Sequence, residues 1–195
     1  MTDPTSGPSA ETGAPGVRGD RLFFALFPDA AAAARIGEAA EDLRLKLGLK
    51  GRVHAQDRLH ITLFHLGDFA GLPPQLVQSA RAAAGAATSA PFEVTLDHAT
   101  SFSGAPGRRP CILKGGDGLA DLLKYRRALA LALAGHGVQT TAAYTPHLTL
   151  LYGDPIPGAE PIPPISWTVR ELVLVRSAIG EDHYERLGAW PLTRT

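Results

Sequence analysis

The chain has 195 residues, of which 45% are hydrophobic, and its 19 basic residues are balanced by 19 acidic ones, so the formal net charge is zero. This length suits one medium-sized domain or two small fused lobes, and it is long enough to bury a core. A neutral chain has no strong overall field to attract duplex DNA, so any nucleic-acid contact should be local, at an end or a single nucleotide.

Residues 1–20 are rich in Pro, Gly, Ser, Thr and Ala and contain almost no large hydrophobic side chain. Such a segment cannot offset the entropy of ordering, which predicts a disordered N-terminal tail. It lacks the apolar run of a signal peptide, and no stretch of the chain is long and apolar enough to span a bilayer. The single cysteine, Cys111, fits a reducing compartment. We therefore expect a cytoplasmic protein that does not bind membranes.

The first part of the remaining chain predicts alternating strands and helices. Residues 21–27 are typical of a buried strand, and residues 30–47 have the apolar spacing of an amphipathic helix that ends at Gly48. The segment 52–66 contains a further strand, and two prolines begin a helix over residues 73–87.

The second part continues the mixture. Its expected elements are strands over 92–96 and 111–113, a helix over 119–134, a strand over 145–151, a proline-rich connector over 155–164, a strand over 169–176 and a final hairpin that reaches Trp190. Strands and helices mix without strict β-α-β alternation, which predicts an α+β fold with largely antiparallel pairing.

One pattern occurs twice. Residues 59–63 read Leu-His-Ile-Thr-Leu, and residues 146–150 read Pro-His-Leu-Thr-Leu. In a strand, residues two apart share a face, so each copy should present an imidazole beside a hydroxyl, with hydrophobic side chains behind them. A Gly-Asp pair follows each copy. The repeat predicts two related half-units that face each other across a shared site.

Two histidines and two threonines in this arrangement suit phosphoester chemistry. Imidazoles titrate near neutrality, so one can act as a general acid while the other acts as a general base. A cyclic phosphodiester needs a water deprotonated on one side of phosphorus and a leaving alkoxide protonated on the other. Threonine hydroxyls can donate hydrogen bonds to the non-bridging phosphate oxygens. This chemistry requires no metal or other cofactor, and we expect none.

The two motifs, the opening strand over residues 22–26 and the closing segment over 184–192 resemble the 2H phosphoesterases. In particular they resemble the bacterial RNA 2′,3′-cyclic phosphodiesterases, often described as 2′-5′ RNA ligase-like. The resemblance runs from about residue 20 to the end of the chain. It implies a single bilobal domain over residues 21–195, in which two antiparallel sheets line a central cleft and the helices lie outside.

The resemblance also implies roles for the motif residues. His60 would be the proton donor to the leaving oxygen, His147 the proton acceptor that activates water, and Thr62 and Thr149 would bind phosphate. The residues themselves do not decide which histidine has which role. The implied reaction opens a 2′,3′-cyclic phosphate, at an RNA 3′ end or on a nucleotide, to a 2′-phosphate. We expect a monomer.

One position departs from the family pattern. Five residues after His147, many relatives carry an arginine that can clamp phosphate, whereas this chain has Tyr152, which can donate a hydrogen bond but carries no charge. Tyr152 is thus a candidate substrate contact, and either phosphate binds more weakly than in these relatives or a cation elsewhere in the chain supplies the charge. Spacing does not discriminate among the candidates, which are Arg52, Arg58, Arg108, Arg109 and Lys114. The equivalent residue after the first motif is His65, which regular alternation predicts to face away from His60.

Other functions stay open. The chain could act on 2′-5′ linked oligonucleotides, by hydrolysis or ligation, or on ADP-ribose cyclic phosphate, and the tyrosine at position 152 is consistent with this. A non-catalytic RNA-end-binding protein could retain the fold, although the intact His-Thr pairs argue against it. A metal hydrolase built on His60, His65 and His147 conflicts with the predicted orientation of His65 and lacks nearby carboxylate ligands. The remaining histidines are predicted to lie on the surface or in loops, namely His54, His98, His136 and His183.

Overall fold

The computed structural model describes residues 19–181 and 183–193. Nearly all of the predicted tail therefore lies outside the described residues. Of residues 1–20, the structure describes Gly19 and Asp20, and Asp20 is already the first residue of a strand.

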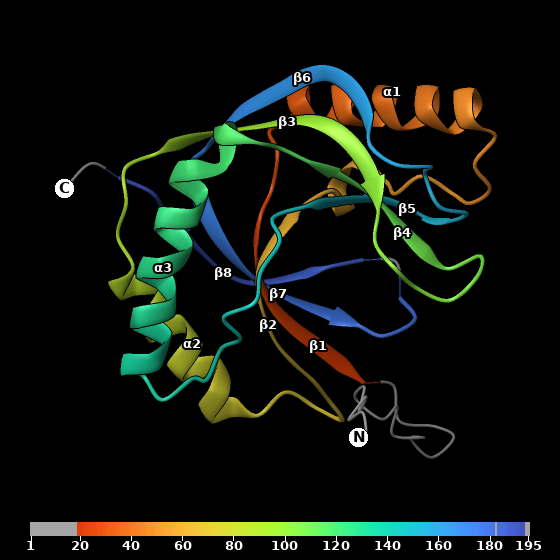
Figure 1. The fold of residues 1–195 in the computed structure, drawn as a ribbon. Coiled ribbons are helices and arrows are strands. Elements are labelled where there is room, and N and C mark those ends of the chain that lie inside the picture. Colours follow the sequence, from red (N-terminus) through yellow and green to blue (C-terminus); the bar gives the residue numbers. More distant parts are fainter. Residues whose placement is uncertain (1–18, 182, 194–195) are drawn as a thin grey trace, which may run out of the picture.

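Eight strands form a sheet of order β6-β3-β4-β5-β2-β1-β7-β8, in which all neighbours are antiparallel (Figure 1). The strands are β1 (Asp20–Leu26), β2 (Ile61–Phe69), β3 (Phe92–Ser101), β4 (Arg109–Lys114), β5 (Leu148–Gly153), β6 (Glu160–Val169), β7 (Glu171–Ala178) and β8 (Glu185–Pro191). The helices are α1 (Ala30–Leu47), α2 (Pro74–Ala86) and α3 (Ala120–Gly135), with short 3-10 turns at Gln56–Arg58 and Asp117–Leu119. The α+β prediction is confirmed.

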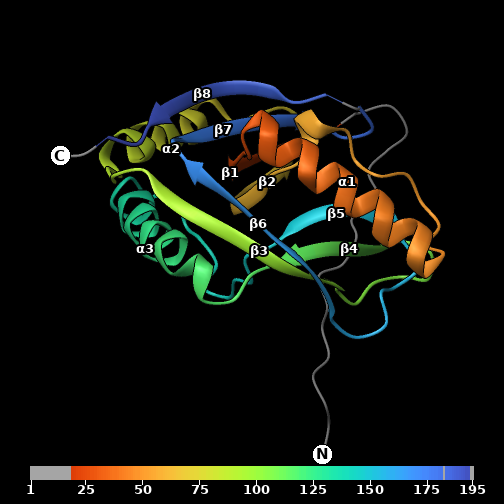
Figure 2. The ribbon, with the colours of Figure 1, turned by 90° about the horizontal axis from the view of Figure 1, so that it is seen from above.

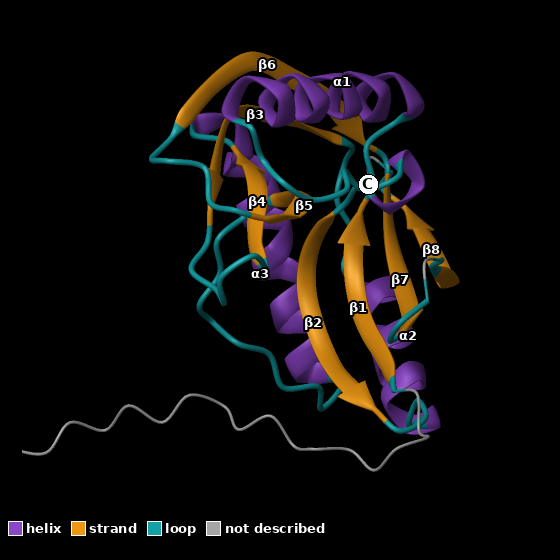
Figure 3. Cartoon of the chain, turned by 90° about the vertical axis from the view of Figure 1, so that its right-hand side faces the viewer, coloured by secondary structure: helices purple, strands orange, loops and turns teal. Residues whose placement is uncertain are grey.

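The sheet consists of two four-stranded halves, β6-β3-β4-β5 and β2-β1-β7-β8. They meet where Ile61 of β2 pairs with Leu148 of β5, the one residue pair recorded between these strands. We expected two separate sheets, whereas the strand order is continuous through this narrow junction. Figure 3 shows the halves as distinct groups of strands. The motif strands are β2 in one half and β5 in the other. Each pairs with the strand that comes before it in the sequence, and an α-helix connects the two strands of each pair: α1 connects β1 to β2, and α3 connects β4 to β5.

The predicted end of helix α1 at Gly48 is confirmed, and the structure adds a cap at its start. The Asp29 carboxylate accepts a hydrogen bond from the Ala32 amide at 2.8 Å, which caps the first turn. Gly48 ends the helix with φ of 62°, a left-handed conformation that glycine adopts without steric cost. Helix α1 lies along β6, where Lys46 pairs with Glu160 and Arg35 donates to the Ser166 carbonyl at 2.8 Å.

The predicted connector over residues 155–164 is partly wrong, because β6 begins at Glu160 and contains Pro161, Pro163 and Pro164. Strand β6 is at the edge of the sheet, where one side of the backbone needs no partner. An edge strand tolerates proline for this reason, and the prolines hinder pairing with another chain.

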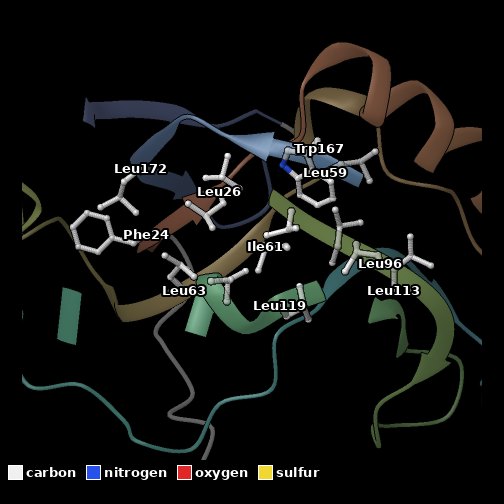
Figure 4. Packing of buried hydrophobic residues seen from close by; sticks show 14 of the residues in the cluster. Phe24, Leu26, Leu59, Ile61, Leu63, Leu96, Leu113, Leu119, Trp167 and Leu172 are labelled. Atoms are coloured by element: carbon white, nitrogen blue, oxygen red, sulfur yellow. The ribbon is translucent and has the colours of Figure 1, made fainter. Parts of the chain in front are cut away.

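One main core lies between the helices and one face of the sheet, and it draws buried side chains from both halves (Figure 4). Helices α2 and α3 lie side by side, and α1 covers a different part of the sheet (Figure 2). On the opposite face of β1 and β7, the side chains of Phe23, Ala25, Val173 and Val175 form a smaller cluster. We call the face that carries this cluster the site face.

Arg126 of α3 connects the loop before β5 to β2 through contacts with both. Its guanidinium lies between two rings, 4.3 Å from the centroid of Phe64 and 4.1 Å from that of Tyr144. Its Nε donates to the Leu63 carbonyl at 3.2 Å and its Nη2 to the Thr141 carbonyl at 2.9 Å. The two halves are therefore held together by this side chain as well as by the strand junction.

We expect Arg126→Ala to lower the free energy of unfolding by about 2–3 kcal/mol, because two carbonyls lose a charged donor and two rings lose a stacked cation. Arg127→Ala is the matched control, since Arg127 is exposed on the same helix and its replacement should change stability by less than about 0.5 kcal/mol. Thermal unfolding followed by circular dichroism measures both. Equal midpoints for the two variants would contradict the fastening role of Arg126.

Candidate active site

Strand β2 contains a β-bulge within its motif. Thr62 pairs with Ala25 of β1, and the next recorded pair joins Phe64 to Phe24, so Leu63 is an extra residue on β2. Leu63 and Phe64 are consecutive, yet both are buried in the main core. A bulge of this kind shifts the alternation of the residues that follow it by one position, up to the next irregularity in the pairing.

Strand β5 has the equivalent bulge. Thr149 pairs with Ile112 of β4 and Leu151 pairs with Cys111, so Leu150 is the extra residue. Leu150 and Leu151 both enter the main core. The two motifs therefore agree in backbone irregularity as well as in residue type.

The bulges place the fifth residue after each motif histidine on the site face. His65 pairs with Phe23, and residues paired directly across strands share a face. The prediction that His65 faces away from His60 is therefore wrong, because it assumed regular alternation through Leu63. On β5 the same shift puts Tyr152 on the face of Thr149.

The His60 ring is fixed by hydrogen bonds at both nitrogens. Nδ1 lies 2.7 Å from the Arg58 carbonyl, and Nε2 lies 3.1 Å from the Thr62 hydroxyl. A carbonyl only accepts, so Nδ1 carries the proton of the neutral ring and Nε2 accepts from Thr62. The basic nitrogen of His60 is thus Nε2, next to the hydroxyl of the same motif.

Aromatic rings surround His60. The centroids of Phe23, Tyr184 and Phe27 lie 5.1, 5.4 and 5.7 Å from that of the imidazole. Burial among these rings lowers the pKa of His60 to about 4, against the opposing effect of the bond to the Arg58 carbonyl. The positive charge of Arg58 lowers the pKa further.

His147 repeats this arrangement. Its Nδ1 donates to the Thr145 carbonyl at 2.7 Å, so Nε2 is again the basic nitrogen. The edge of Phe102 meets the ring, with centroids 4.7 Å apart. Burial lowers the pKa of His147, and the positive charge of Lys114 adds to this effect. The side chain of Lys114 shares the face of Ile112 and Thr149, since it lies two residues beyond Ile112 on β4.

The two motifs are linked through Tyr144. Its hydroxyl donates to the Thr62 carbonyl at 3.0 Å, and the next residue, Thr145, accepts the bond from His147. The segment that orients His147 is thus anchored on β2, the strand that contains Thr62 and directly follows His60.

The structure discriminates among the five cations that spacing could not place. Arg58 lies beside His60 and Lys114 beside His147. Arg109 donates instead to the Gly104 carbonyl at 3.2 Å in the turn between β3 and β4, where Arg108 is exposed. Arg52 lines a pocket in the segment between α1 and β2.

His54, which we predicted to lie on the surface or in a loop, is a neighbour of the site. Its amide donates to the Leu150 carbonyl at 2.8 Å, and its ring lies 5.7 Å from that of Tyr152 in an edge-to-face arrangement. This contact joins segments almost a hundred residues apart, and no local pattern around His54 indicates it. The aromatic residues Phe23, Phe27 and Phe102 were likewise not identified as neighbours of the histidines.

His65 is engaged in a polar cluster on the site face. Its Nε2 lies 2.8 Å from the Asp68 carboxylate, which also accepts two hydrogen bonds of 2.8 Å from Arg21. The Arg21 guanidinium holds the pKa of Asp68 well below its usual range. Asp68, the aspartate of the Gly-Asp pair that follows the first motif, lies within β2 opposite Arg21.

Two further observations concern the described residues as a whole. Within residues 19–181 and 183–193, no three His, Cys, Asp or Glu side chains are grouped so that they could hold a metal ion. None of the helices in this part of the chain is both long and apolar enough to cross a membrane.

Comparison with known proteins gives a consistent result. A search of the curated proteins found no match. The apo structure of E. coli LigT is 25% identical, with 90% of this chain and 99% of LigT covered and a TM-score of 0.70. LigT complexed with 3′-AMP is 27% identical at the same coverage, with a TM-score of 0.67. TT0787 of Thermus thermophilus is 26% identical over 88% of this chain and 97% of its own, with a TM-score of 0.63.

A family model described as the 2′-5′ RNA ligase superfamily matches residues 27–181, which include both bulged motif strands. The chain therefore belongs to the 2′-5′ RNA ligase superfamily of 2H phosphoesterases.

Proposed function

We propose that this protein is a metal-independent phosphodiesterase that opens the 2′,3′-cyclic phosphate of an RNA 3′ end or a nucleotide to a 2′-phosphate. One observation carries the proposal. Each motif histidine donates Nδ1–H to a backbone carbonyl, which leaves Nε2 as its proton-transfer atom, and each is followed by a threonine on the site face. Structures of LigT with 3′-AMP, NADP+, ATP and phosphate support a nucleotide or phosphate ligand for this site.

The reaction assigns a different proton transfer to each histidine. His147 Nε2 takes a proton from water as the water oxygen attacks phosphorus. The bond from phosphorus to O3′ breaks, and His60 Nε2–H gives its proton to O3′. Thr62 and Thr149 hydrogen-bond the non-bridging oxygens, and the charges of Arg58 and Lys114 stabilise the transition state in place of the arginine found in many relatives.

Substrate charge is part of this mechanism. In the free protein, burial favours neutral rings at both positions, which suits His147 as a base but not His60 as an acid. A bound phosphate anion raises the pKa of a neighbouring imidazole, because the opposite charge favours the protonated ring. The anionic substrate thereby favours the protonated form of His60, which is the form that can act as the acid.

We expect His60→Ala and His147→Ala each to lower kcat for a nucleoside 2′,3′-cyclic phosphate by about 100-fold or more, because each removes one proton transfer. Thr62→Ala and Thr149→Ala should be milder, about 10- to 100-fold, because each removes one hydrogen bond to a charged oxygen. Chromatographic separation of the cyclic substrate from the phosphomonoester, in the presence of EDTA, measures these rates.

His136→Ala is the matched control, since His136 is exposed at the end of α3 and should retain full activity. Circular dichroism of each variant checks its fold. Wild-type rates in both motif-histidine variants would refute the assignment. Inactivity of the wild type on the cyclic phosphate, with cleavage of a 2′-5′ linkage, would move the function to the alternative substrate class.

The pH dependence follows from the lowered pKa of His60. The log of kcat/KM reports the free enzyme, and it should fall on the alkaline side as His60 loses its proton. Because burial puts this pKa at about 4, the fall in kcat/KM should begin at a pH below about 6.5, the unperturbed pKa of histidine. The profile of kcat, which reports the bound state, should be displaced to higher pH by the substrate anion. Coincident profiles would contradict the role of substrate charge.

A further inference from the structure

A small cationic pocket adjoins the site. The segment between α1 and β2 forms it, with a volume of about 230 Å3 and a lining of Arg52, Val53, His54, Ala55 and Arg58. Two arginines and a histidine thus line one pocket in a chain whose net charge is zero. We call it the 52–58 pocket.

On one side the pocket shares its wall with the surroundings of His60. The Arg58 carbonyl accepts the His60 Nδ1–H bond at 2.7 Å, and the Arg58 guanidinium lies over the Tyr184 ring, 4.7 Å from its centroid. The Tyr184 ring in turn lies 5.4 Å from that of His60. Arg58 therefore belongs both to the pocket and to the surroundings of the proposed acid.

A second residue of the pocket lining, His54, contacts β5. His54 is fixed there by its amide bond to Leu150, and its ring meets that of Tyr152, which is 52% exposed on the face of Thr149. Two residues that line the 52–58 pocket thus contact the two motif segments: Arg58 contacts His60, directly before β2, and His54 contacts Leu150 and Tyr152 of β5.

We propose that the 52–58 pocket binds the internucleotide phosphate on the 5′ side of the terminal nucleotide. This inference rests on the proposed function and makes an RNA end a better substrate than a mononucleotide. Guanidinium groups match the geometry of phosphate oxygens, and such a contact reads no base sequence. The volume is below the range of about 300–1,000 Å3 typical of sites for whole small molecules, which fits a phosphate group better than a nucleoside.

Three substrates test the inference by their kcat/KM values in EDTA. The first is a nucleoside 2′,3′-cyclic phosphate, the second is the same compound with a 5′-phosphate, and the third is a dinucleotide that ends in the cyclic phosphate. We expect kcat/KM of the wild type to be about ten-fold higher for the second and third substrates than for the first, because one hydrogen bond to a charged group contributes about this factor.

Arg52→Gln should remove most of this preference, because it removes the positive charge of an arginine that lines the pocket. Lys50→Gln is the matched control, since Lys50 is an exposed cation of the same segment that does not line the pocket. It should leave the preference unchanged. Equal thermal midpoints for both variants and the wild type establish that the comparison reflects binding.

Each outcome has a distinct meaning. Equal kcat/KM for all three substrates in the wild type would overturn this inference and leave the proposed function standing. A preference for the dinucleotide alone would assign recognition to the second nucleoside and overturn the phosphate site. So would a preference that persists in both Arg52→Gln and Arg58→Gln. Lack of turnover with every substrate would overturn the proposed function together with this inference.

Discussion

One extra residue in each motif strand, Leu63 in β2 and Leu150 in β5, determines which side chains share the site face. Each strand must bury hydrophobic side chains against the helices on one face and present polar groups on the other. Without the bulge, the fifth residue after each motif histidine would point into the core. With it, His65 and Tyr152 join the histidine and threonine of their own strands. The bulge also leaves a carbonyl outside the regular ladder, and at Leu63 the Arg126 side chain hydrogen-bonds to it.

The second feature on which the site depends is the use of backbone carbonyls to fix the histidine tautomers. The Arg58 and Thr145 carbonyls each take an Nδ1–H, so neither ring depends on a carboxylate partner. A carboxylate would raise the pKa and add negative charge near a phosphate. Aromatic packing around His60 and Phe102 against His147 does the opposite, because burial favours the neutral rings. In the proposed mechanism the substrate itself supplies the negative charge.

The fold class, the paired motifs and the order of elements apart from β6 could be predicted from sequence, because they rest on local hydrophobic periodicity and on a repeat. Helix α1 with its end at Gly48 is a clear case. The orientation of His65 could not be predicted, since a bulge depends on the partner strand. His54 lies beside Tyr152 through a contact across the chain that leaves no local signal. The prolines of β6 led us to predict a loop. A strand tolerates them at the edge of a sheet, and the position of β6 at the edge depends on how the whole sheet is assembled.

The most direct test of the account is phosphorus NMR of a nucleoside 2′,3′-cyclic phosphate incubated with the purified protein and EDTA. The account predicts that the cyclic signal is replaced by a single 2′-phosphomonoester signal. That product identifies metal-free hydrolysis and the departure of O3′ in one spectrum. A cyclic signal that persists would contradict the proposed hydrolysis, and a 3′-phosphomonoester product would contradict the assignment of O3′ as the leaving oxygen.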